Sequence, residues 1–190
     1  MSKFIFEPTD IAEAYIINSF FVEDNRGSFV KPYEKYLFEE AGISFNCNES
    51  FISSSSKHVV RGMHFQLYHP QIKLVGVLQG KVYDVIVDLR SDSKTFGQWR
   101  GYYLSSENRT SLLIPRGCAH GFISLSDNSV VSYMCDGKYD KDTDTGIIFN
   151  DSDIGIDWPV NDLSSVILGS RDRGLMSFKD FKNNCKFTYE

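Results

Sequence analysis

Residues 82–88 read Val-Tyr-Asp-Val-Ile-Val-Asp and alternate regularly between two kinds of position. In an extended chain this pattern places Asp84 and Asp88 on one face, and Tyr83, Val85 and Val87 on the other. The stretch follows a turn signal, Leu-Gln-Gly-Lys, at residues 78–81. These residues therefore predict a β-strand over 81–88.

Similar short stretches recur on both sides of this strand, about every eight to twelve residues. Turn signals separate them at residues 105–108, 115–117 and 126–128. This spacing predicts an antiparallel β-sandwich or barrel and not alternating βαβ units. The other predicted strands cover residues 14–18, 51–56, 59–65, 72–78, 98–104, 111–114, 121–125 and 130–135.

One segment, residues 34–41, has the apolar spacing of a short helix, and Gly42 predicts its end. Residues 140–157 are dense in Asp, Gly and Ser, which predicts a loop-rich C-terminal extension wrapped around the β core. We find no internal repeat or linker. The 190 residues are therefore expected to form a single domain, residues 1–190, because domains average roughly 150 residues.

The composition excludes several classes of protein. A hydrophobic share of 42% and an aromatic share of 14% favour a folded core over disorder. With 20 Lys+Arg against 25 Asp+Glu the net charge is −5. A chain with this excess of acidic residues is not expected to have the basic surface that nucleic-acid binding needs. The chain has no apolar run near the ~20 residues of a membrane span and no N-terminal signal core, so we expect a cytoplasmic protein. The four cysteines are too far apart for a zinc ribbon or a redox pair: Cys47, Cys118, Cys135 and Cys185.

The hexapeptide Arg61-Gly62-Met63-His64-Phe65-Gln66 is the first candidate for chemistry. Strand alternation directs Gly62, His64 and Gln66 to one face, and Arg61, Met63 and Phe65 to the other. A histidine and an amide would then project together into the space that the sheet encloses. A core histidine satisfied by hydrogen bonds is an equally good interpretation of this segment alone.

The segment Pro115-Arg116-Gly117-Cys118-Ala119-His120-Gly121 resembles the second half-motif of the cupin barrel, whose histidine points into the barrel. The three metal ligands of the first half-motif would correspond to His64, Gln66 and Lys73, with Gly80 following at the expected distance. Gln and Lys are poor ligands for a divalent metal. The resemblance therefore implies a jelly-roll cupin without a metal, in which an ammonium group stabilises an anion directly.

Two further segments are ambiguous by themselves. Tyr133 shares a strand face with Val131, and a buried tyrosine in a strand most often serves packing. The sequence Ser170-Arg171-Asp172 is typical of a solvated turn. Only their combination with the histidine segments gives them functional weight.

Together these segments resemble the dTDP-4-dehydrorhamnose 3,5-epimerase family, whose members are metal-free cupins. The matches begin with Asp24-Asn25-Arg26-Gly27-Ser28-Phe29 and run in order from about residue 18 to 175. The resemblance implies an isomerase of nucleotide-diphosphate 4-keto sugars in deoxysugar biosynthesis, without a cofactor. The other matching stretches are 60–66, 73–75, 80–90, 93–99, 104–108, 114–122, 150–151 and 155–159.

The family's reaction removes a proton beside a 4-keto group and returns one from the opposite face of the sugar, which needs a base, an acid and a cation. The resemblance implies that His64 is the base and that Asp172 orients its imidazole, as the acid of a catalytic triad does. Tyr133 would be the acid on the other face. Lys73 would lie near the 4-keto oxygen.

The resemblance also implies binding roles. Arg61 and Arg26 would contact the diphosphate, with Arg26 supplied by the partner subunit of a homodimer. His120 and Arg171 would line the sugar and phosphate region. Tyr139 would stack on the base, with Phe29 as a second wall of that pocket. Gln66, Lys31 and Ser53 complete the predicted substrate-binding set.

Two departures from the family concern the substrate. The family usually has an acidic residue at the position of Lys31, and usually reads Gln-x-Asn-His-Ser where this chain has Glu49-Ser50-Phe51-Ile52-Ser53. Neither departure affects the four residues of the predicted chemistry. The base (thymine or guanine), the sugar length (hexose or heptose) and the inverted centres (carbon 3, carbon 5 or both) all remain open.

Three other functions compete with this interpretation. One is a metal-dependent cupin oxygenase that would use His64, His69 and His120. Another is a sugar-nucleotide binder that kept the fold and lost the chemistry. A third is the related sugar 3,4-ketoisomerase, whose motif order the chain resembles less well.

Overall fold

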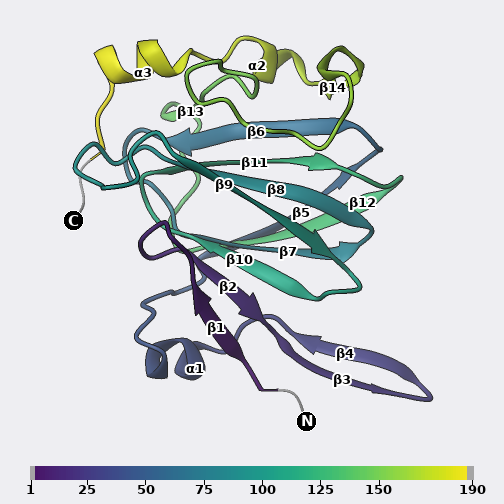
Figure 1. Ribbon diagram of the computed structural model, residues 1–190. Helices are drawn as coiled ribbons and strands as arrows, with labels where there is room; N and C mark the ends of the chain where they lie inside the picture. Colours follow the sequence, from purple (N-terminus) through teal and green to yellow (C-terminus); the bar gives the residue numbers. More distant parts are fainter. Residues whose placement is uncertain (1–2, 188–190) are drawn as a thin grey trace.

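Two antiparallel β-sheets face each other in the computed structural model, which describes residues 3–187 (Figure 1). The first sheet has six strands in the order β1 (Ile5–Pro8), β2 (Tyr15–Asn18), β10 (Thr110–Ile114), β7 (Lys73–Gln79), β12 (Ser129–Cys135), β5 (Glu49–Ser55). The second has the order β13 (Asp144–Gly146), β6 (Val59–Gln66), β11 (Cys118–Ser124), β8 (Lys81–Asp88), β9 (Trp99–Ser105), and β14 (Ile167–Leu168) pairs in parallel with β6. The predicted all-β architecture is confirmed.

The remaining elements surround the two sheets. The hairpin of β3 (Phe20–Asp24) and β4 (Gly27–Lys31) extends away from the barrel, and α1 (Lys35–Glu40) lies near the first sheet (Figure 1). The short helices α2 (Ser170–Arg173) and α3 (Phe178–Asn184) lie over the outer face of the second sheet, and a 3-10 turn spans Leu163–Ser165. No helix among residues 3–187 is long and apolar enough to cross a membrane.

The space between the sheets is filled by side chains from both of them. Val82 and Ile86 of β8 belong to this inner cluster, whereas Val85 and Val87 belong to a second cluster outside the sheet. The alternation predicted for this strand is therefore present, and both of its faces are buried. Members of the inner cluster from other strands are Val75, Val77, Leu104, Leu112, Phe122, Val131 and Tyr133.

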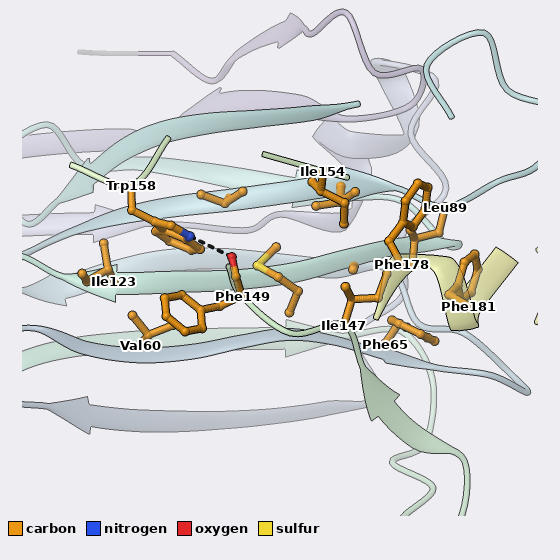
Figure 2. Close-up of a cluster of buried hydrophobic side chains, with 14 of the residues drawn as sticks. Val60, Phe65, Leu89, Ile123, Ile147, Phe149, Ile154, Trp158, Phe178 and Phe181 are labelled. Atoms are coloured by element: carbon orange, nitrogen blue, oxygen red, sulfur yellow. Dashed lines mark hydrogen bonds between the residues drawn. The ribbon is translucent and has the colours of Figure 1, made fainter. Parts of the chain in front are cut away.

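The C-terminal extension covers the outer face of the second sheet, as predicted. Its apolar side chains pack on Met63 and Phe65 of β6, and Trp158 Nε1 donates a hydrogen bond to the Phe149 carbonyl oxygen at 2.9 Å (Figure 2). Burial of each large aromatic contributes about 2–3 kcal/mol. Apolar side chains between residues 147 and 187 thus belong to the core. The extension contributes Ile147, Phe149, Ile154, Trp158, Phe178, Phe181 and Phe187 to this cluster.

Several elements differ from the sequence expectations. Every predicted strand is present, but β11 begins at Cys118 because the preceding turn already closes at Gly117, whose φ is +76°. The hairpin strands β3 and β4 were not predicted, and neither were the short strands β1, β13 and β14. The helix α3 was also missed, although Ser177 accepts a hydrogen bond from the Asp180 amide, a helix-start signal present in the sequence.

Candidate active site

A pocket of about 560 Å³ opens between the two sheets, beneath the segment that carries β14 and α2. Eight of the predicted site residues line it together: His64, Tyr133, Asp172, Lys73, Ser53, Arg61, His120 and Arg171. Six of them come from strands that are far apart in the sequence, and Arg171 and Asp172 come from α2. The other lining residues are Phe51, Val59, Val60, Ile167, Leu168 and Gly169.

His64 and Asp172 form a hydrogen-bonded pair, with Nε2 of the imidazole 2.7 Å from Oδ1 of the carboxylate. Asp172 also accepts a hydrogen bond from the Gly62 amide at 3.3 Å. Burial alone would raise the pKa of Asp172, but the bonds from His64 and Gly62 outweigh it and lower the pKa. An ionised Asp172 accepts the Nε2 proton and leaves the lone pair on Nδ1, free to take a proton.

Residues 170–172 do not form the solvated turn that this segment alone suggests, because they belong to α2 and bury Asp172 to 7% exposure beside His64. Arg61 does not face away from His64 either, since both line the pocket. The reason is a β-bulge: Phe122 pairs with Arg61 and His120 with His64, so β6 holds one more residue than β11 and the alternation resets.

The bulge depends on close contact between two glycines. A Cβ atom on Gly62 would lie 2.4 Å from the Cα atom of Gly121, and φ of Gly62 is +135°. Only glycine combines this backbone conformation with such an approach. The two glycines thus set the orientations of Arg61 and His64 relative to the pocket.

Lys73 and Tyr133 line the same pocket from β7 and β12, which are neighbours in the first sheet. Burial lowers the pKa of Lys73, against the opposing charges of nearby Asp144 and Glu49. Burial also raises the pKa of Tyr133, and the charge of Asp84 adds to the effect. Tyr133 therefore keeps its phenolic proton at neutral pH.

The Tyr133 ring is held by aromatic contacts on the side of β5 and on the side of β11. It stacks on Phe51 with ring centroids 4.5 Å apart and planes inclined by 13°. The His120 ring meets it edge-on at 6.0 Å. These contacts fix the plane of the phenol at the wall of the pocket.

A second histidine–aspartate pair lies deeper. His120 Nε2 is 2.9 Å from each carboxylate oxygen of Asp84, and both side chains are buried. Burial raises the pKa of Asp84, and His120 only partly offsets this. The pairing of Asp84 with His120 was not predicted from the sequence, although the alternation of 82–88 already placed Asp84 on one strand face with Asp88.

The polar groups at the pocket wall differ in how well they are satisfied. Arg61 donates from Nε to Ser55 Oγ and from a terminal nitrogen to the Ser54 carbonyl, each at 3.0 Å. Arg171 pairs with Asp144 at 2.8 Å. Ser53 Oγ is buried without a hydrogen-bond partner among residues 3–187, so it can bond to a ligand.

The structure places the other five predicted residues outside the pocket lining. Arg26, Phe29 and Lys31 lie on the exposed β3–β4 hairpin, where Arg26 pairs with Asp24 and Lys31 with Glu34. Tyr139 is 48% exposed on the loop after β12. The amide of Gln66 donates to the His69 carbonyl at 3.0 Å and accepts from the Asp140 amide at 2.8 Å, so it holds loops together.

A larger hollow of about 970 Å³ lies elsewhere in the molecule, and His69 lines it together with Arg116 and Asp136. His69 is thus separated from His64 and His120, with which the alternative oxygenase would need it to bind iron. Within residues 3–187 no group of three His, Cys, Asp or Glu side chains could hold a metal ion.

The sequence analysis did not place Phe51 and the 167–169 segment in the pocket. Phe51 occupies a position where the chain departs from the family pattern, and that departure was the available signal. No local pattern marks residues 167–169, since they reach the pocket only because β14 pairs with β6.

Comparison with known proteins places this geometry in a family. The family model described as dTDP-4-dehydrorhamnose 3,5-epimerase matches residues 8–180. The chain belongs to this family. The predicted enzyme class, an isomerase of the epimerase type, and the predicted cupin-type fold are therefore confirmed.

Individual relatives cover nearly the whole chain. The dTDP-4-dehydrorhamnose 3,5-epimerase of Methanothermobacter thermautotrophicus is 42% identical over 173 residues, which is 91% of this chain and 94% of the relative. A Legionella pneumophila epimerase, solved with dTDP-4-keto-L-rhamnose, has a TM-score of 0.93 at 35% identity and covers 99% of this chain and 100% of its own. A Bacillus anthracis member of the family, with TDP and pyrophosphate bound, has a TM-score of 0.88 at 40% identity over 93% of this chain and 100% of its own.

Proposed function

We propose that this protein epimerises a nucleotide-diphosphate-linked 4-keto sugar at one or both carbons beside the keto group. One observation carries the proposal. The hydrogen-bonded pair of His64 and Asp172 shares a single pocket with the phenol of Tyr133 and the amino group of Lys73. A base, an acid and a cation for a developing oxyanion are the groups that such a reaction requires.

The first step is the removal of a proton by His64. Nδ1 takes the proton from the carbon beside the keto group, and the C–H electron pair moves to the keto oxygen as an enolate. Asp172 stabilises the imidazolium that forms, because its lowered pKa keeps it ionised. The ammonium form of Lys73 would stabilise the enolate oxygen, and the nearby carboxylates of Asp144 and Glu49 favour that form against the burial that lowers the pKa of Lys73.

The second step is reprotonation from the other face. The phenol of Tyr133 donates its proton to the carbon and the enolate returns to the ketone with inverted configuration. The raised pKa of Tyr133 ensures that the phenol carries this proton at neutral pH. Both residues then regain their starting protonation states by exchange with solvent, so solvent hydrogen enters the product.

Binding of the substrate involves the residues around this centre. The relatives solved with dTDP-4-keto-L-rhamnose and with TDP hold nucleotide ligands in the same fold. In this chain Arg61, Arg171 and His120 would contact the phosphate and sugar, and the unpaired hydroxyl of Ser53 would accept or donate one more bond. The base would stack on Tyr139.

A homodimer would complete the site. Arg26, Phe29 and Lys31 lie on a hairpin that extends away from the barrel, and Phe29 is 58% exposed (Figure 1). Exposed apolar side chains on a projecting hairpin are typical of an interface. In a dimer this hairpin would bring the three residues to the pocket of the partner subunit.

The test is hydrogen exchange. The protein is incubated in deuterated water with 4-keto sugars on thymidine diphosphate and on guanosine diphosphate, and NMR records which ring positions take up deuterium. We expect uptake at carbon 3, carbon 5 or both, and the positions observed decide between a 3-epimerase and a 3,5-epimerase. The same exchange assay with hexose and with heptose substrates shows which sugar length the protein accepts.

The variants His64→Ala and Tyr133→Phe complete the experiment. We expect His64→Ala to abolish exchange, and Tyr133→Phe to block inversion while leaving proton removal by His64 partly intact. Full exchange in both variants would contradict the assigned roles. Tight binding of every sugar nucleotide without exchange in the wild-type protein would instead support the non-catalytic binder.

A further inference from the structure

We propose that Glu49 makes the base site selective for a nucleobase that carries an amino group, such as guanine or cytosine, over thymine. This inference rests on the proposed function, in which the base of the substrate stacks on Tyr139. It adds the base specificity, which the family resemblance leaves open. The family usually has a glutamine at this position.

Glu49 continues a row of side chains that already lines the pocket. Residues 49, 51 and 53 of β5 point to the same face, because side chains alternate along a strand. Phe51 and Ser53 line the pocket. Glu49 is the next member of the row and lies where β5 begins, beside the 137–139 loop.

The carboxylate of Glu49 is oriented by one donor on each oxygen. Gln71 Nε2 donates to Oε1 at 3.0 Å, and the amide of Tyr139 lies 3.4 Å from Oε2. Gln71 is itself buried and also donates to the Gly137 carbonyl at 2.8 Å, which holds its amide in place. The acceptor is therefore fixed directly beside the backbone of the residue on which the base would stack.

The hydrogen-bonding capacity of this carboxylate is not exhausted. A carboxylate offers about four lone-pair positions, and the two donors of the protein occupy two of them. Unlike the amide of a glutamine, a carboxylate accepts hydrogen bonds and donates none. It therefore selects for ligand groups that carry N–H bonds.

The edges of the bases differ in this respect. Guanine presents a ring N–H and an amino group side by side, which match the two oxygens of a carboxylate, and cytosine presents an amino group. Thymine presents a single N–H between two carbonyl oxygens, and both of those oxygens would face the negative charge. A carboxylate beside an anionic diphosphate ligand is also unfavourable unless the base supplies donors to it.

The experiment measures the binding of TDP, GDP and CDP by calorimetry to the wild-type protein and to Glu49→Gln. Glu107→Gln, an exposed residue in the turn after β9, is the matched control for loss of one negative charge. We expect the wild-type protein and the control to bind GDP or CDP about tenfold to a hundredfold more tightly than TDP. Glu49→Gln should lose this preference, and the order of GDP and CDP identifies the base.

Two results would overturn the inference: a wild-type protein that binds TDP at least as tightly as GDP and CDP, or a preference that persists in Glu49→Gln. If Glu49→Gln does not fold, the wild-type ranking alone decides. The exchange assay separates this inference from the proposed function. Exchange in thymidine-linked sugars without base preference refutes only the role of Glu49, whereas a clear base preference without exchange on any nucleotide refutes the epimerase.

Discussion

The two histidine–aspartate pairs of this protein are neighbours with the same chemistry and different surroundings. His64 of β6 and His120 of β11 are directly paired across the two strands, and each imidazole meets one carboxylate through Nε2. The His64 side chain is 24% exposed to the pocket, whereas the His120 side chain is 5% exposed. The first pair is therefore the more accessible to a ligand, although His120 also lines the pocket.

The carboxylates of the two pairs differ in their hydrogen-bond donors and in the direction in which their pKa is shifted. Asp172 lies on α2 and accepts a second hydrogen bond from the Gly62 amide, so its pKa is lowered although burial opposes this. Asp84 lies inside the barrel with His120 as its hydrogen-bonding partner, and burial raises its pKa. A carboxylate with extra donors keeps its charge and can stabilise an imidazolium, which a desolvated carboxylate does less well.

The identity of the two partners alone therefore does not make a histidine–aspartate pair catalytic. The extra backbone donor and the opening to the pocket distinguish His64 and Asp172 from the buried pair. We expect His120 to contact the substrate and to position the Tyr133 ring, and Asp84 to hold His120 in place, without either residue taking part in proton transfer.

Substitution of each histidine in turn is expected to have the largest effect on the reaction rate. His64→Asn should lower the rate of solvent-hydrogen incorporation by about 10³-fold or more, because general base catalysis typically contributes about 10²- to 10⁴-fold. His120→Asn should lower it by about tenfold, because it removes a packing and binding contact. The rates are measured by NMR in deuterated water with saturating substrate.

Circular dichroism and thermal unfolding of both variants serve as the control for folding. Equal losses of activity in two folded variants would show that the pairs are not functionally distinct. A larger loss in His120→Asn would reverse the assignment of the base.

The next comparison concerns the two carboxylates. Asp172→Asn should lower kcat by about 10²-fold or more, because a neutral amide neither stabilises the imidazolium nor fixes the tautomer with the lone pair on Nδ1. Asp84→Asn should keep most of kcat and chiefly change KM. Steady-state kinetics with separate kcat and KM values check this, and a kcat loss confined to Asp84→Asn would contradict it.

Much of this site was accessible from the sequence. The alternation of residues 82–88 and the regular turn signals predict the β-barrel because strand periodicity is local information. The residues around His64, Tyr133 and Asp172 gained their interpretation from family resemblance, and the structure brings them into one pocket. The observed pocket accordingly holds eight predicted residues.

The missed features are those that depend on distant contacts. The Arg61 orientation follows from a bulge, and the bulge depends on how closely Gly62 and Gly121 approach across two strands. The burial of Asp172 depends on the docking of a one-turn helix that no local pattern announces. The β3–β4 hairpin was missed because its residues lie outside the core whose burial creates a clear periodicity.

The glycine contact between the two strands offers a test through stability. Gly62→Ala should lower the free energy of unfolding by about 2–3 kcal/mol, since the new Cβ would lie 2.4 Å from the Gly121 Cα and φ is +135°. Gly169→Ala is the matched control, because its Cβ would meet nothing within 4 Å. Urea unfolding measures both. A loss below about 0.5 kcal/mol in Gly62→Ala would show that the strands separate easily, and that the bulge does not fix the orientations of Arg61 and His64.

The smallest expected effect is a difference between the two pairs in the pH dependence of the free energy of unfolding. The folded-state pKa of Asp172 is lowered, so its contribution to stability is present above its unfolded pKa of about 3.9 and is lost as the pH falls through the folded value. The folded-state pKa of Asp84 is raised, so its contribution is present below about pH 3.9 and is lost as the pH rises through the folded value.

The difference in unfolding free energy between wild type and Asp172→Asn should therefore shrink on acidification below pH about 4, by about 1.4 kcal/mol for a tenfold difference in acidity between the folded and unfolded states. The difference in unfolding free energy between wild type and Asp84→Asn should instead shrink as the pH rises above about 4. Urea unfolding between pH 3 and pH 7, a range set by the reference pKa of about 3.9, measures both. Parallel slopes would mean that the two carboxylates carry charge equally well in the folded protein. In that case the bond from the Gly62 amide could not be what distinguishes the pocket pair from the buried one.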